Sequence, residues 1–93
     1  MKIIWSKTAL NDLKEIKAYI SKDSIYSALY VVESILDKVA LLTDMPHTGH
    51  RVPESLNENL REIHSTPYRI IHNTSAHEIH IVTIVHMARH LSL

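Results

Sequence analysis

The strongest constraint on the fold is a change of apolar periodicity halfway along this 93-residue chain. The first half carries two stripes of apolar residues at spacings of three and four, over 9–20 and 28–42. This spacing places the apolar side chains on one face of an α-helix. The second half instead carries runs rich in Ile and Val, which are typical of β-strands. Two amphipathic helices followed by consecutive strands restrict the chain to few folds.

Turn-forming residues divide these patterns into elements. The stretch "SKDS" at 21–24 separates the two helices so briefly that they should form an antiparallel hairpin. Ser6 can cap the first helix, and Asp23 or Ser24 can cap the second. The second helix should end before Pro46, where the long loop 46–59 begins; it holds two of the three prolines and the only glycine. The predicted strands are 2–5, 60–64, 68–73 and 78–86.

The expected order is therefore β-α-α-β-β-β, an α+β fold. We predict a helix hairpin packed on one face of a small, mostly antiparallel sheet, in a single domain spanning residues 1–93. The apolar stripes of the helices should join the inward residues of the sheet in one core. The residues expected in this core are Trp5, Leu13, Ile16, Ile20, Val32, Ile35, Val39, Leu42, Ile70 and alternate residues of 79–85.

Composition narrows the functional classes. Ten basic and ten acidic residues cancel, so the chain lacks the basic excess that accompanies tight binding to nucleic-acid phosphates. It has no cysteine for disulfides or thiolate chemistry, which suits a reducing cytoplasm. No apolar run approaches the roughly 18 residues of a membrane helix, and the N-terminus lacks a signal-peptide core. We therefore expect a soluble cytoplasmic protein that does not bind membranes.

Eight histidines lie in the second half of the chain, but their spacing does not predict a metal site. His80 and His86 stand six residues apart on one predicted strand, which separates them by roughly 20 Å. Histidines at this distance cannot share an ion, and no ligand set of known zinc spacing is present. We predict no metal and no cofactor. His72 and His80 should instead be half-buried residues of the sheet with hydrogen-bond partners.

Two arginines, Arg61 and Arg69, lie inside predicted strands rather than at their ends. Burying an unpaired guanidinium is costly, and successive strand residues point to opposite faces. If Tyr68 and Ile70 face the helices, Arg69 should face away. Pairing across the turn at 65–66 would place Arg61 on the same uncovered face.

We therefore expect Arg61, Arg69 and Arg89 to be exposed or partly exposed on the side away from the helices. In the alternative interpretation, Arg69 simply pairs with a carboxylate such as Glu62 or Glu78.

With these elements in place, the chain resembles the RelE/ParE superfamily of bacterial toxins from type II toxin–antitoxin systems. The resemblance covers nearly the whole chain and is carried by an ordered set of segments, not by any single one. They are "ALNDLKEIKAYI", "LLTDMPHTGHRVPES", "LREI", "YRIIH" and "IVTIVHMAR". The fold that this resemblance implies is the same β-α-α-β-β-β arrangement.

The superfamily implies two kinds of activity, both held inactive by a cognate antitoxin. RelE-like members are ribosome-dependent endonucleases that cut mRNA, whereas ParE-like members poison DNA gyrase without nuclease chemistry. "GHRVPES", "LREI", "YRIIH" and "VHMAR" are more similar to the ParE-like, plasmid-stabilisation type. The resemblance thus favours a growth-inhibiting, non-enzymatic gyrase inhibitor. The alternatives are a RelE-like nuclease acting on the ribosome and mRNA, and an inactive member that only binds its antitoxin.

Candidate site residues follow from the resemblance and from the arginines. In a nuclease, Arg69 would act on the scissile phosphate, Glu54 would be the base, and His86 or His90 the acid. The chain departs from the nuclease pattern, since it is neutral, has no lysine after residue 38 and has no tyrosine after residue 68. For binding a target, the expected residues are Arg61, Arg69, Arg89 and His90.

Overall fold

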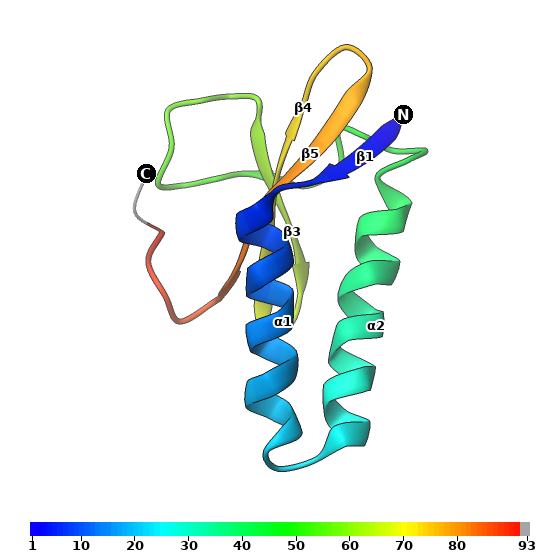
Figure 1. Ribbon diagram of the computed structural model, residues 1–93. Helices are drawn as coiled ribbons and strands as arrows, with labels where there is room; N and C mark the ends of the chain where they lie inside the picture. The colour runs from blue at the N-terminus through cyan, green and yellow to red at the C-terminus, as the bar shows by residue number, and fades with distance from the viewer. Residues whose placement is uncertain (92–93) are drawn as a thin grey trace.

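The computed structural model describes residues 1–91 and confirms the predicted order of elements, with one additional strand (Figure 1). The elements are β1 (Lys2–Trp5), α1 (Lys7–Ser21), α2 (Ile25–Leu41), β2 (His50–Arg51), β3 (Leu60–Ser65), β4 (Tyr68–Thr74) and β5 (Glu78–His86). The additional strand is β2, inside the segment 46–59 that was predicted to be a loop. Its two residues are too few to show the alternation by which strands are recognised in a sequence.

The strands form one sheet in the order β1-β5-β4-β3-β2. β1 pairs with β5 in parallel, and the other neighbours pair antiparallel, so the prediction of a mostly antiparallel sheet is confirmed. The helix hairpin covers one face, where α1 packs on β5 and α2 packs on β3 (Figure 1). The α+β class and the helix hairpin on one side of the sheet therefore stand as predicted.

Both helices begin at predicted serine caps. The Oγ of Ser6 accepts a hydrogen bond from the Ala9 N–H at 2.9 Å, and the Oγ of Ser24 accepts one from Ser27 at 3.2 Å. Each serine satisfies one of the backbone donors that the first turn of a helix leaves free. Within residues 1–91, neither helix combines the length and the hydropathy needed to cross a membrane.

The core lies between the helices and the sheet, as the apolar stripes predict. Its fully buried members include Ile35, Val39 and Leu42 of α2 together with Ile70 and Ile79 of the sheet. Other residues expected to be buried are only half-buried: Trp5, Leu13, Ile16, Ile20 and Val32. Trp5, Leu13 and Ile16 pack against the core from its margin, because β1 is the edge strand and α1 lies over its neighbour β5.

The alternation in β5 changes phase at Val82. Pairing between β4 and β5 shifts between Ile71 and His72, so that Val82 is the extra residue of a β-bulge. The buried side chains are consequently Ile79, Ile81 and then Ile84, and the prediction of strict alternation over 79–85 is wrong beyond the bulge.

The N-terminal segment holds this bulge in place. The hydroxyl of Ser6 donates to the Val82 carbonyl at 2.7 Å. The Asp12 carboxylate accepts from the Ile84 N–H at 3.0 Å and from the Thr83 hydroxyl. Polar groups of the helix start and of α1 thus satisfy backbone groups that the irregular ladder leaves free.

Replacing Asp12 by alanine should therefore destabilise the protein. The change leaves the N–H of the buried Ile84 without its acceptor, and an unsatisfied buried donor costs about 1–3 kcal/mol. Urea unfolding at neutral pH measures the loss. Asp12→Asn, which keeps a carbonyl oxygen as acceptor, should lose clearly less, and equal stabilities of Asp12→Ala and the parent chain would contradict the assignment.

Candidate functional site

The connection between β3 and β4 decides which side chains share a face of the sheet. The two strands pair so that His64 lies opposite Arg69 and Arg61 lies opposite His72. Because residues opposite each other share a face and successive residues alternate, Arg61 and Arg69 lie on opposite faces. The prediction that both arginines share the uncovered face is therefore wrong. Arg61 is half-buried, as expected, but not on the face of Arg69.

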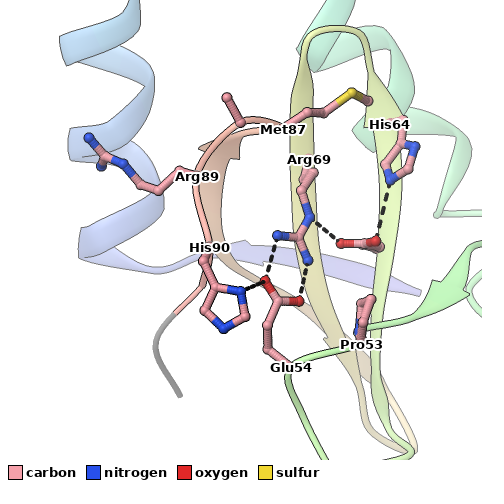
Figure 2. Close-up of a pocket in the computed structure, with 9 residues that line it drawn as sticks. Pro53, Glu54, His64, Arg69, Met87, Arg89 and His90 are labelled. Carbon is pink, nitrogen blue, oxygen red and sulfur yellow. Dashed lines mark hydrogen bonds and ion pairs between the residues drawn. The ribbon is translucent and has the colours of Figure 1, made fainter.

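Arg69 alternates with the core residues Tyr68 and Ile70 and so faces away from the helices, as predicted, but it is not exposed there: only 7% of the residue is accessible. Its Nε donates to Glu62 at 2.6 Å, and its Nη1 and Nη2 donate to the two oxygens of Glu54 at 2.8 and 2.7 Å (Figure 2). The side chain of Glu54 is as buried as that of Arg69, and the side chain of Glu62 is slightly more buried. We call Glu54, Glu62 and Arg69 the carboxylate clasp. The prediction of an exposed Arg69 failed because two carboxylates together compensate for the burial of its charge.

Of the two alternative partners considered for Arg69, Glu62 is the correct one. It is buried, although it was expected to form only an exposed pair. Glu78 lies elsewhere, 3.2 Å from the Nε2 of His80, which is half-buried as predicted.

Two histidines extend the clasp at its ends. The Nε2 of His64 lies 3.4 Å from Glu62, and the Nδ1 of His90 lies 3.8 Å from Glu54 (Figure 2). The backbone N–H of Leu91 also donates to Glu54, at 2.8 Å. Glu54 therefore connects Arg69 in the sheet to the segment that follows β5.

The contacts within the clasp favour the charged forms of Glu54 and Arg69. The hydrogen bonds from Arg69, supported by the Leu91 N–H, lower the pKa of Glu54 to about 2. The same carboxylate raises the pKa of Arg69 further above its usual value, against the opposing effect of burial. At neutral pH Glu54 is a carboxylate and Arg69 a guanidinium.

The loop that carries Glu54 is fixed against the sheet at two points near its start. Gly49 has φ of 111°, and a Cβ at this position would collide with the backbone carbonyl of Glu62, so only glycine fits here. His72 is fully buried, not half-buried as predicted, and its Nε2 lies 3.1 Å from the Thr48 carbonyl. Burial lowers the pKa of His72, which favours the neutral ring.

The clasp lines an open cavity of about 610 Å³, and Figure 2 draws the residues around it. Its lining is Pro53, Glu54, Glu62, His64, Arg69, Met87, Ala88, Arg89 and His90. Arg89 and His90 both line it and are exposed; exposure was expected of Arg89, although its side chain is directed towards α1 rather than away from the helices (Figure 2). The cavity thus unites Glu54, Arg69, Arg89 and His90 of the candidate residues, whereas Arg61 lies outside it.

His86 also lies outside this cavity. Its ring stacks edge-on against Tyr68, with 5.5 Å between the ring centroids, and its Nδ1 accepts a hydrogen bond from the Ala88 N–H. Among residues 1–91, no group of three or more His, Cys, Asp or Glu side chains is placed to hold a metal ion. The site is therefore a buried ion cluster beneath an exposed arginine and histidine.

Arg69→Ala should lower the free energy of unfolding by about 3–5 kcal/mol, because it leaves two buried carboxylates without a cation. Thermal and urea unfolding measure the change. The control is a triple variant with Arg69→Met, Glu54→Gln and Glu62→Gln, which removes all three charges together and should recover most of the loss. An Arg69→Ala variant with the same melting temperature as the parent chain would contradict the stabilising role of Arg69 in the clasp.

Stability should also fall in acid through Glu54. Its pKa is lower in the folded chain than the ordinary value of 4.5, so the folded state binds this proton less readily than the unfolded state. The stabilisation is therefore complete above about pH 4.5 and is lost as the pH falls towards 2. In urea unfolding between pH 6 and 3, Glu54→Gln should show a shallower loss than the parent chain. Parallel pH profiles would contradict this assignment.

Comparisons with known proteins agree with the resemblance seen in the sequence. A solved structure described as "Chromosomal ParDE TA system from P. aeruginosa" is similar to this chain, with a TM-score of 0.75 and 23% identity. The match covers 92% of this chain and 95% of that one, and it supports the fold alone. A comparison with curated proteins gives no match. A family model described as "ParE toxin of type II toxin-antitoxin system, parDE" matches residues 3–91, so the chain belongs to the ParE toxin family.

Proposed function

We propose that this ParE toxin inhibits growth by binding DNA gyrase in the cytoplasm, and that it does not cleave RNA. Membership of the family makes it the toxin of a type II pair and implies a cognate antitoxin as its partner. The gyrase target is the step beyond family membership. The observation that carries the proposal is the state of Arg69, whose three guanidinium nitrogens each donate to a carboxylate of the chain itself.

This state of Arg69 disfavours RNA cleavage. Metal-free cleavage needs a free cation at the phosphate, a base and an acid. The charge of Arg69 is already offset by Glu54 and Glu62. Glu54, with a pKa of about 2, is too weak a base to take a proton efficiently near pH 7. Of the two candidate acids, His86 lies outside the cavity that holds Arg69 and Glu54, whereas His90 lines it, 3.8 Å from Glu54.

The exposed segment after β5 is the better candidate for contact with a target. Of the four expected binding residues, Arg69 is buried and Arg61 lies on the other face of the sheet. Arg89 and His90 are adjacent, exposed, and rim the same cavity. Within residues 1–91, no carboxylate lies within ion-pair distance of Arg89, so its charge is available to a partner. We therefore assign target contact to Arg89 and His90.

The experiment that tests this function is a supercoiling assay with purified gyrase and the purified chain, run beside an analysis of mRNA integrity in cells that express the chain. We expect inhibition of supercoiling and intact mRNA. Ribosome-dependent mRNA cuts without gyrase inhibition would overturn the proposal in favour of a RelE-like activity. Normal growth and neither effect would identify an inactive member that only binds its antitoxin.

The double variant Arg89→Ala with His90→Ala should weaken gyrase inhibition by at least about tenfold, the equivalent of roughly 1.4 kcal/mol of contact. Its free energy of unfolding should change by less than about 0.5 kcal/mol for the exposed side chains. Arg51→Ala is the matched control, since Arg51 is an exposed arginine on β2 whose nearest carboxylate, Glu58, is 4.0 Å away. Equal losses in both variants would show a general charge effect rather than contact at the strand end.

A further inference from the structure

The segment after β5 is held at its start and at its end. We call residues 87–91 the C-terminal strap. At its start, the Met87 N–H donates to the Pro67 carbonyl at 2.8 Å. At its end, the Leu91 N–H donates to the Glu54 carboxylate at 2.8 Å. The strap therefore spans from the turn between β3 and β4 to the loop that follows β2.

The anchor at the end of the strap is a side chain, and that side chain is itself fixed. One oxygen of Glu54 accepts from both Arg69 and Leu91, while its other oxygen accepts a second bond from Arg69. A bidentate pair with a planar guanidinium sets the direction of a carboxylate as well as its distance. Arg69 is held in turn by Glu62 through its Nε. The position of Leu91 is thus determined from the sheet, through a chain of charged groups.

The residues between the two anchors are the ones assigned to target contact. Figure 2 shows His90 beside Glu54, with Arg89 directed towards α1 on the other side of the strap. The side chain of His90 is 86% exposed, so packing does not hold it. Arg89 rims a second cavity with Glu15 and Tyr19 of α1. Their placement depends on the path of the backbone between residues 87 and 91, in which the N–H groups of Ala88 and Arg89 also donate to His86, at 3.0 and 2.9 Å.

We propose that Glu54 is a positioning residue of this toxin: its carboxylate holds the Leu91 N–H and so keeps the strap in the arrangement that presents Arg89 and His90 to the target. The assignment rests on the proposed contact by those two residues. It gives the buried clasp a role in toxicity that requires no contact between Arg69 or Glu54 and the target. It also predicts that removing the donor at Leu91 has the same effect on toxicity as removing the acceptor.

Leu91→Pro tests the donor side, because proline has no backbone N–H and leaves Glu54 and Arg69 unchanged. Leu91→Ala is the matched control, since it shortens the same side chain and keeps the N–H. Glu54→Ala tests the acceptor side. Three quantities are measured for each chain: the melting temperature, the backbone order parameters of Arg89 and His90 by ¹⁵N relaxation, and growth arrest on expression.

In Leu91→Pro we expect the order parameters of Arg89 and His90 to fall from about 0.85 to below about 0.6, with a melting temperature close to that of the parent chain. Growth arrest should require at least about tenfold more protein. Leu91→Ala should resemble the parent in all three quantities. Glu54→Ala should lose order in the strap and toxicity, and should also melt earlier, because Arg69 loses its bidentate partner.

Two results would overturn the positioning role. One is a Leu91→Pro chain whose strap becomes mobile while growth arrest is unchanged. The other is a strap that stays ordered in both Leu91→Pro and Glu54→Ala. The target is tested separately: a parent chain that arrests growth without inhibiting gyrase refutes the gyrase target, and the comparison of Leu91→Pro with Leu91→Ala still decides the role of Glu54. A parent chain that does not arrest growth refutes both.

Discussion

The buried guanidinium of Arg69 is the constraint on which the position of the loop before β3 and of the segment after β5 depends. A charge that is removed from water must be matched nearby, and Arg69 is matched by two carboxylates from different parts of the chain. Glu62 is on the neighbouring strand, whereas Glu54 must be delivered by a loop. The need to neutralise one strand residue therefore determines where the loop passes, and the loop in turn receives the end of the chain.

Such a cluster is better explained by geometry than by stability. Replacing a buried ion pair with well-packed apolar residues is often neutral or stabilising, so the clasp is weak evidence for a gain in folding energy. The cluster does, however, fix the orientation of its side chains. The guanidinium is planar, and both oxygens of Glu54 accept hydrogen bonds from it, so these bonds can form in only one arrangement. Irregular segments without strand pairing, such as residues 52–59 and 87–91, obtain a defined position from this arrangement.

The parts of the fold that could be predicted are those that depend on local periodicity. The helix stripes, the two serine caps and the long strands depend on residues close in sequence, and they were confirmed. The faces of the arginines were not predictable in the same way. The register across a two-residue turn decides whether Arg61 joins Arg69, and a shift of one residue reverses the answer. The bulge at Val82 likewise depends on Ser6 and Asp12, which are about 70 residues away in the chain.

The candidate site also depends on a contact between distant residues that the sequence pattern does not reveal. Glu54 and Arg69 were both candidate residues, but as base and phosphate ligand of a nuclease they would have to be free to act on RNA. Their contact joins a loop residue to a strand residue 15 positions further along the chain, so no periodicity reveals it, and it changes the chemistry of each. A carboxylate held by arginine becomes a weak base, and an arginine held by two carboxylates offers little charge to a phosphate. The same pair of residue types that could support cleavage is thus converted, by its mutual contact, into a support for the exposed strap above it.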